Sequence, residues 1–391
     1  MKPIFSCLIL IASLMVSVSR AEIFKADTVE QLQAALDKAL PEDIIQLRPG
    51  KYTLDKPLVF RKGGLGSQPV TVLATEKGRA VFTGAFGFVF NDISSIQLEG
   101  LVFYAIKQPC VLSLNSSRNI RIIACEFHKC GPVAIQAPVD DLHIPPLFME
   151  GCYFRHCVGV DDLMALRAES NRLINNTFDT CGGTLRFSGD RNQLRGNYFI
   201  GSAPGGLAIH LLGNKNVFTN QYLHEVQAPS LRRGVVDAGQ VRESSFGHNT
   251  WYHCSTPVFV LGEEGQLSAK NTFANNLIQN HPAETAPVIE LSSGVVDLMW
   301  ANNLLYDPAG QSNLVVGATV TFLSDNPKLV ETNGVWRASA ESPAVDAGTG
   351  RTGSSMMDIE GRVRGLRPDI GAHEISRENP SLERITSIYF K

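Results

Sequence analysis

The chain has 391 residues, of which 44% are hydrophobic and 19% charged, and its formal net charge at pH 7 is −3. This length and apolar content allow a large buried core. A mildly acidic chain without a basic run is a poor candidate for binding nucleic acid, so we expect no nucleic-acid partner.

The first 21 residues are typical of a secretory signal peptide. Lys2 precedes an apolar run at 8–16, and Ser19-Arg20-Ala21 forms a small-x-small cleavage pattern. Removing this segment leaves 33 basic and 38 acidic residues, a formal charge of −5. No later segment approaches ~18 consecutive apolar residues, so we expect no membrane span. The sequence predicts an exported protein, secreted or periplasmic, and we expect a monomer.

The next segment, residues 22–65, begins with a predicted helix. Apolar residues at 29, 32, 35, 36 and 39 have helical spacing, and Asp27 or Thr28 can cap the first turn. Residues 41–52 then read as a first strand and turn. We expect the helix to cover the open N-terminal end of the structure that follows, where backbone edges would otherwise be exposed.

A short phrase, Asn or Cys followed by any residue and a large apolar residue, recurs between residues 101 and 307. Its copies start at Cys125, Cys152, Asn176, Asn197, Asn220, Asn249, Asn276 and Asn303. Leu101-Val102-Phe103 fits as an earlier member without the Asn or Cys, and with it the starts are 21 to 29 residues apart. Such a period is typical of a solenoid with one coil per repeat. Each copy lies in a short alternating run broken by turn residues, which indicates strands. The sequence therefore predicts an all-β fold, a right-handed parallel β-helix spanning residues 66–320.

The recurring residues predict columns inside the stack. Asn tolerates the left-handed region at a bend, and stacked amides can hydrogen-bond between coils. The aromatic residues would stack inside, next to a column of Cys130, Cys157 and Cys181. Seven cysteines remain without the signal peptide, and we expect them to be free, although Cys125 with Cys152, or Cys130 with Cys157, could pair.

Residues 321–391 are predicted to form a C-terminal cap and tail. Asp346, Asp358, Asp369 and Glu374 occur in Gly-containing phrases typical of tight turns, which would close the C-terminal end of the stack. A metal site built from the same four carboxylates is the alternative. From Ser376 onward we expect a loose tail.

Candidate functional residues gather on the coils between 152 and 235. Arg167 and Ser188 each lie nine residues before a phrase Asn, and Arg186 shares the face of Ser188 by the period-2 rule. Strand spacing places Arg167 and Arg186 roughly 8 Å apart. Asp161 and Asp162 precede this strand, and His210, Arg232 and Arg233 follow on the next coils.

This combination of residue types suits an acidic polysaccharide. Lytic cleavage of a uronate polymer needs a cation to neutralise the C5 carboxylate, a base for the α proton and an acid for the leaving O4. A metal or arginine can do the first, and lysine, arginine, histidine or tyrosine the others. An exposed arginine more often has no role beyond contact with solvent. The hypothesis of lytic cleavage therefore depends on the grouping of these charged residues on neighbouring coils.

The segments 41–52, 68–74, 81–84 and above all 162–178 resemble the parallel β-helix polysaccharide lyases that include chondroitinase B and many alginate lyases. The likeness covers most of residues 22–235. It implies β-elimination, with calcium held by two glutamates, a lysine base and an arginine acid.

Carried onto this sequence, the family's second glutamate falls on Asp162, and the first falls on Val160, which cannot bind a metal. The lysine falls on Arg167, and the arginine acid on Ser188, two residues from Arg186. A substrate-contacting arginine falls on His210 and another near Arg233. The asparagine of the calcium site should lie near 130–135, where there is none.

We therefore expect a lyase acting on a uronate polymer, with alginate the leading substrate and chondroitin or dermatan next. Its catalytic residues would be Arg167 as base and Arg186 or His210 as acid. The substrate-binding residues would be Arg232, Arg233 and Ser188. Asp161 and Asp162 either hold a weak calcium ion (Ca²⁺) or orient the arginines.

Two alternatives stay open from the sequence. The first is a non-catalytic carbohydrate-binding protein that has lost the lyase machinery, which the residues Val160 and Ser188 favour. The second is a glycoside hydrolase, which needs two carboxylates about 5 to 10 Å apart. The sequence offers only the adjacent Asp161 and Asp162, whose side chains would point to opposite faces of a strand.

Overall fold

The computed structural model describes residues 21–114, 117–136, 146–284, 287–310, 313–350, 356–375 and 380–389. All but the last residue of the predicted signal peptide lies outside these ranges. In the described residues, no helix is long and apolar enough to cross a membrane.

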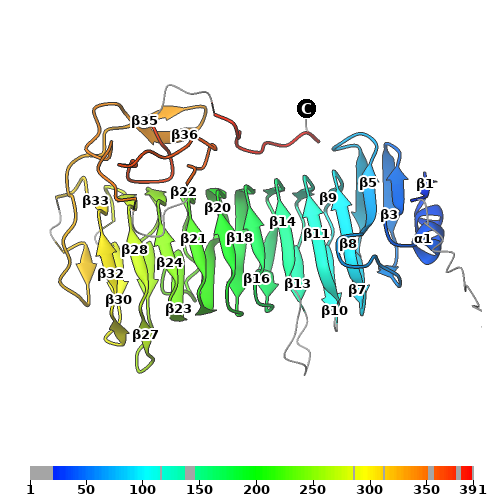
Figure 1. Cartoon of the computed structure of the whole chain (residues 1–391), viewed down its shortest axis with the longest axis horizontal. Helices are drawn as coiled ribbons and strands as arrows, with labels where there is room; N and C mark the ends of the chain where they lie inside the picture. The colour runs from blue at the N-terminus through cyan, green and yellow to red at the C-terminus, as the bar shows by residue number, and fades with distance from the viewer. Residues whose placement is uncertain are drawn as a thin grey trace, which may run out of the picture.

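The molecule is a stack of β-coils with three ladders of parallel strands running along its length (Figure 1). It confirms the expected all-β, right-handed parallel β-helix. The first ladder is a 12-stranded sheet made of β1 Ile23–Ala26, β2 Ile44–Leu47, β5 Val70–Ala74, β8 Ser94–Glu99, β11 Arg118–Ile123, β14 Leu147–Glu150, β17 Arg172–Ile174, β19 Gln193–Arg195, β21 Val217–Thr219, β24 Ser245–Gly247, β28 Thr272–Ala274 and β32 Met299–Ala301.

The second ladder, here called the lateral ladder, carries the recurring phrase. It consists of β3 Gly50–Leu54, β6 Ala80–Gly84, β9 Val102–Tyr104, β12 Glu126–His128, β15 Tyr153–Arg155, β18 Thr177–Phe187, β20 Tyr198–Asn214, β22 Tyr222–His224, β25 Thr250–Tyr252, β29 Leu277–Gln279 and β33 Leu304–Tyr306.

The third, here called the groove ladder, shares the long strands β18 and β20 with the lateral ladder. Its other members are β4 Leu58–Phe60, β7 Phe88–Asn91, β10 Val111–Leu114, β13 Ala134–Gln136, β16 Val158–Leu166, β23 Val236–Arg242, β26 Phe259–Leu261, β30 Ile289–Leu291 and β34 Val315–Val316, with β27 Ser268–Ala269 and β31 Val295–Val296 beside it.

The one helix of the described residues, α1 Val29–Lys38, lies at the N-terminal end of the stack (Figure 1). The Thr28 hydroxyl caps it by accepting a hydrogen bond from the Gln31 amide at 3.3 Å. Leu32 and Leu36 on one face are buried, and the helix packs against β1, β2, β3 and β4. The apolar stripe read from the sequence is therefore the face that contacts the first coils.

The core contains the aromatic column that the sequence predicts. Neighbouring rings of Phe103, Phe127, Phe154, Phe178 and Phe199 stack with centroids 4.5 to 4.9 Å apart and nearly parallel planes. These distances match the spacing of parallel strands, so each ring covers the next.

The amide column continues through five asparagines and one glutamine: Asn176, Asn197, Gln221, Asn249, Asn276 and Asn303. The Gln221 side chain takes the place that the sequence assigned to Asn220. Tyr222 pairs with Tyr198, and Leu223 with Phe199. The phrase at 220 was therefore aligned one residue too early.

The left-handed bend also falls one residue before the column. Asn175, Asn275 and Asn302 have φ between 49° and 58°, and Gly196 has φ of 67°. The expected amide hydrogen bonds between coils are confirmed, whereas the expected backbone bend at the column asparagines is wrong, because it lies one residue earlier. A second buried column, missed in the sequence, joins Asn171, Asn192, Asn216, Ser244 and Asn271.

All seven cysteines from Cys110 onward are free and buried, which confirms the expectation of unpaired thiols. The Cys157 Sγ donates to the Phe127 carbonyl at 3.2 Å. Burial raises the pKa of the Cys152 and Cys254 thiols to about 12. These cysteines act as small hydrophobic residues of the core.

The C-terminal segment does not close the end of the stack. From β35 Leu329–Thr332 and β36 Val335–Ala338 it turns back and runs along the lateral ladder (Figure 1). The Trp336 amide donates to the Tyr222 hydroxyl at 2.9 Å, and the Ala372 amide donates to Thr250 Oγ1 at 2.9 Å. The lateral ladder presents large tyrosines on its outward face. Covering them with the C-terminal segment is favourable, because it removes their apolar surface from water.

The expected loose tail is also wrong for the described residues 380–389. The Glu126 carboxylate accepts hydrogen bonds from the Ser387 hydroxyl at 2.7 Å and the Ile388 amide at 2.8 Å. The Tyr389 ring lies 5.8 Å from that of Tyr104. Residues 387–389 are thus bound to a coil far from the last one.

The four C-terminal carboxylates that could have formed a metal site belong to turns and ion pairs. Asp358 Oδ1 accepts from two backbone amides of its own turn, at 2.7 and 2.9 Å. Asp369 accepts from the Asp346 amide, and Glu374 from the Arg364 guanidinium at 2.9 Å. Among the described residues no group of three or more His, Cys, Asp or Glu is arranged to hold a metal ion.

Candidate functional site

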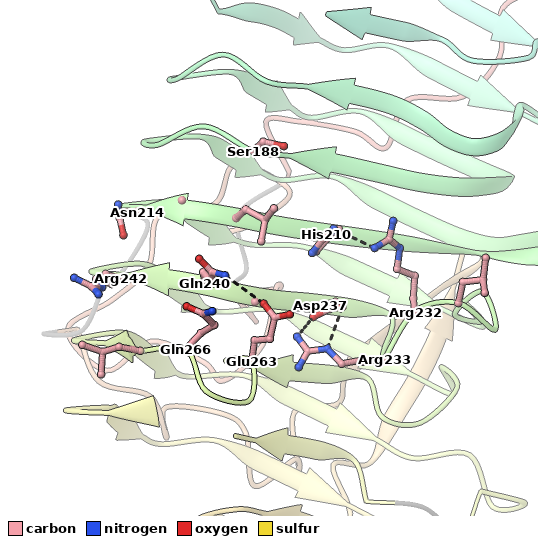
Figure 2. Close-up of a pocket in the computed structure, with 15 residues that line it drawn as sticks. Ser188, His210, Asn214, Arg232, Arg233, Asp237, Gln240, Arg242, Glu263 and Gln266 are labelled. Carbon is pink, nitrogen blue, oxygen red and sulfur yellow. Dashed lines mark hydrogen bonds and ion pairs between the residues drawn. The ribbon is translucent and has the colours of Figure 1, made fainter. Parts of the chain in front are cut away.

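A groove crosses the groove ladder at β16, β18, β20 and β23. It consists of two adjoining pockets of about 750 and 450 Å³, which share Leu231 and Arg232. The larger pocket is lined mostly by polar residues, and Figure 2 shows them projecting from successive coils. The site is long and open, as a polymer requires.

Register places three ionisable residues in one outward column. Arg186, His210 and Asp237 pair with one another on consecutive strands, so their backbones are separated by one strand spacing each, about 4.8 Å. Their chain neighbours Phe187 and Leu211 are buried. Alternation along the strands therefore turns these polar side chains outward over a packed core.

Arg186 is held by Asp162. Its Nε lies 3.1 Å from both carboxylate oxygens, and its Nη2 lies 3.0 Å from Oδ1. Both side chains are largely shielded, with 25% and 18% of their surface exposed. A bidentate ion pair of this kind holds the guanidinium in one orientation and also stabilises its positive charge.

His210 lies between two guanidinium groups. Its Nδ1 is 3.3 Å from Arg186 Nη1 and 3.2 Å from Arg232 Nη1. Guanidinium groups only donate, so Nδ1 must be the acceptor and the proton is on Nε2. Burial, opposed by Asp237 and reinforced by the neighbouring arginines, lowers the pKa of His210. The imidazole is therefore neutral at pH 7, with its Nε2–H free of these two contacts.

Arg232 reaches the site from the loop between β22 and β23. Its Nε donates to the Thr184 hydroxyl at 3.3 Å, which orients the side chain toward the middle of the groove. Burial and the nearby charge of Arg186 lower the pKa of Arg232. The guanidinium groups of Arg186 and Arg232 both face His210 and form a cationic centre where the two pockets meet. Figure 2 shows the Arg232 side of this centre.

Arg233 has an acidic partner of its own. It forms an ion pair with the buried Asp237, and its Nη1 donates to the Gly262 carbonyl at 2.7 Å. The sequence suggested that Arg233 anchors a substrate carboxylate. Its charge is instead balanced within the protein, so it shapes the wall of the larger pocket.

The remaining expected residues have different positions. Ser188 lines the larger pocket, whereas Asp161, Asp162 and Arg186 line the smaller one. Arg167, one residue beyond the pairing of Leu166 with Phe187, has an exposed side chain and lines neither pocket. Within the described residues, it forms no ion pair.

Asp162, one of the two residues expected to hold calcium, is already engaged by Arg186. Both oxygens of Asp162 accept hydrogen bonds from Arg186, and the neighbouring Val160, 96% exposed, offers no ligand. Calcium takes six to eight oxygen ligands. The positive charge at this position is supplied by Arg186.

Several groove residues were missed in the sequence. Asp237 follows His210 in register by one coil, a relation hidden by the irregular loop at 225–235. Glu263, Gln240, Asn214 and Arg242 also line the larger pocket, and Gln240 Nε2 lies 3.5 Å from a Glu263 oxygen (Figure 2). Gln240, Arg242 and Glu263 come from coils beyond those that the sequence had singled out, whereas Asn214 ends the strand that carries His210.

Comparisons with known proteins support the fold. No family model matches the sequence, and no curated protein is a significant match. Pectate lyase Pel9A superposes with a TM-score of 0.56 at 15% identity, covering 91% of this chain and 97% of Pel9A. This chain has the fold of Pel9A. At such identity the likeness shows the β-helix and nothing of the chemistry.

Weaker similarities are found to proteins of different function. The PL6 family alginate lyase AlyGC gives a TM-score of 0.45 at 15% identity, with 92% of this chain covered. This chain spans 59% of the length of AlyGC. PfbA, a surface adhesin of Streptococcus pneumoniae, gives 0.45 at 11% identity, covering 80% of this chain and 99% of PfbA.

Proposed function

We propose that this protein is an exported, monomeric polysaccharide lyase that binds a uronate polymer in the groove and cleaves it by β-elimination. Alginate is the leading substrate, with chondroitin or dermatan next. The observation that carries the proposal is the convergence of Arg186 and Arg232 on His210. In the same scheme, α1 is a cap that protects the first coil.

Arg186 is assigned to the substrate carboxylate. Asp162 keeps it oriented, and its charge neutralises the C5 carboxylate so that the α proton becomes acidic. This replaces the calcium ion of the lyases that the sequence resembles. The reaction is then independent of metal.

Arg232 and His210 are assigned to the proton transfers. The neutral form of Arg232 takes the C5 proton, the C4–C5 double bond forms, and the C4–O4 bond breaks. His210 gives its Nε2 proton to O4 while Arg232 passes a proton to Nδ1, so protons and electrons balance. Only the neutral fraction of Arg232 reacts, and the lowered pKa of its guanidinium increases that fraction.

The test is the ultraviolet absorbance of unsaturated products from alginate, chondroitin, dermatan and pectate. We expect product from at least one polymer, and a loss of about 100-fold or more in Arg232→Ala and His210→Ala. Arg167→Ala is the matched control, since Arg167 lies outside both pockets. Its activity should stay within about threefold of the parent. No product from any polymer would overturn the lyase proposal.

A hydrolase is the second candidate, because Asp237 and Glu263 line one pocket. Hydrolysis would need one of them as acid and the other as base or nucleophile. The Asp237 carboxylate is engaged by Arg233, whereas the Glu263 carboxylate accepts only from Gln240 among the described hydrogen bonds. New reducing ends without ultraviolet absorbance, abolished by Glu263→Gln, would favour this candidate over the lyase.

A further inference from the structure

A second pocket lies on the 12-stranded sheet, separate from the groove ladder. It has a volume of about 420 Å³ and lies over β11, β14 and β17. Arg121, Phe148 and Arg172 are in register on these three strands, so their side chains form one outward column. The neighbouring residues Ile120, Ile122, Met149 and Leu173 are buried in the core.

The charges of the two arginines are the main feature of this pocket. Within the described part of the chain, neither Arg121 nor Arg172 forms an ion pair, and no acidic residue lines the pocket. Glu99 and Glu150 lie in the next outward column and are outside the pocket lining. Among the described residues, the pocket therefore presents two positive charges without a carboxylate in its lining, in contrast to the groove.

Phe148 organises this pair. The Arg121 guanidinium carbon lies 5.2 Å from the centre of the Phe148 ring, within the range of a cation–π contact. The ring occupies the strand between the two arginines, whose backbones are two strand spacings apart, roughly 9 to 10 Å. The two arginines therefore start from backbone positions spaced along the axis of the stack, with the Phe148 strand between them.

The pocket wall is also preformed. The Gly66 carbonyl accepts hydrogen bonds from Ser95 Oγ at 2.9 Å and Asn119 Nδ2 at 2.9 Å, and Ser94 Oγ donates to the Gly64 carbonyl at 3.0 Å. These bonds fix the loop that carries Ser67 at the edge of the pocket. Small polar groups on a fixed wall are suited to sugar hydroxyls.

We propose that the pocket of Arg121, Phe148 and Arg172 is a non-catalytic binding site for an acidic polysaccharide. Two cations spaced along the helix axis match a polymer that carries carboxylates at regular intervals, whereas a single small anion would use only one. The site lies on a different sheet from the groove, so one chain could contact polymer at two places. Two contacts raise the effective affinity without new chemistry.

The experiment measures binding of polymannuronate, polyguluronate and polygalacturonate to the full chain by affinity electrophoresis and calorimetry. We expect Arg121→Ala/Arg172→Ala to weaken binding of at least one of these polymers by about tenfold or more. Phe148→Ala should have a smaller effect in the same direction. Product formation from a short oligosaccharide, if the groove is catalytic, should not change.

Arg195→Ala is the matched control. Arg195 is exposed on β19 of the same sheet, in the neighbouring outward column and outside the pocket. Its replacement should leave binding within about twofold. Equal weakening by Arg195→Ala would mean that only general charge matters, and would overturn the proposal.

Two other outcomes would also overturn it. One is unchanged binding in the double variant with an unchanged thermal unfolding midpoint. The other is binding of a sulfated polymer such as dextran sulfate with no binding of the three carboxylated ones. A matching midpoint in all variants ensures that lost binding reflects the site and not the fold.

Discussion

The Arg186 guanidinium forms an ion pair with the Asp162 carboxylate through two nitrogens. Nε lies 3.1 Å from both oxygens, and Nη2 lies 3.0 Å from Oδ1. The pair joins two consecutive coils of the groove ladder. Arg186 also reaches His210 on the following coil, so one arginine couples three coils at the centre of the groove.

Replacing Asp162 should impair the site without unfolding the protein. In Asp162→Asn the amide cannot form the two-pronged ion pair, so Arg186 loses its orientation and product formation should fall by about 10- to 100-fold. Asp161→Asn is the control, since Asp161 is exposed and forms no ion pair among the described residues. Equal losses in both variants would show that only the net charge of the strand matters.

Removing calcium should have no effect. Because both Asp162 oxygens are engaged by Arg186, we expect equal rates with calcium and with excess chelator. The thermal unfolding midpoint should also be unchanged, since a ligand that bound the native state would raise it. A calcium-dependent rise of several degrees would contradict the arginine assignment.

Breaking the amide column should be costly for stability. Asn197 accepts from the Asn176 amide at 3.0 Å, and its Nδ2 donates to the Leu173 carbonyl at 2.9 Å and to Gln221 at 3.0 Å. Asn197→Ala leaves these buried groups unpaired and should lower the free energy of unfolding by about 3 kcal/mol. Asn214→Ala, at the half-buried end of β20, should lower it by less than about 1 kcal/mol. Urea unfolding measures both.

Acidification should destabilise the protein through two buried histidines, His248 on a coil and His373 in the C-terminal segment. Burial, assisted by Arg364, lowers the pKa of His248 to about 2, and burial near Arg337 lowers the pKa of His373. Unfolding would let both bind protons near their ordinary pKa of ~6.5. Their stabilising contribution is therefore complete above that pH and is lost as the pH falls below it.

The expected slope is about 1.4 kcal/mol per pH unit for each histidine below pH ~6. Burial raises the pKa of Asp358, Asp369 and Glu374, which acts in the opposite direction at lower pH. His248→Asn should reduce the slope between pH 7 and 5. A free energy of unfolding that stayed constant over this range would contradict the prediction.

The sequence by itself determined the parallel β-helix. Asn176 and Phe178 recur one coil later as Asn197 and Phe199, because every coil must satisfy the same turn and fill the same layer of the core. Such local repetition is visible without coordinates. It also located α1, whose apolar stripe follows from helical spacing alone.

Only the tertiary structure decided the chemistry of the groove and the path of the chain end. A register shift between Asp162 and Met164 directs Asp162 toward Arg186, and a non-repeating loop delivers Arg232 to His210. The contact of Glu126 with Ser387 joins residues 261 positions apart. Irregular segments carry no period, so their partners depend on how the completed stack packs.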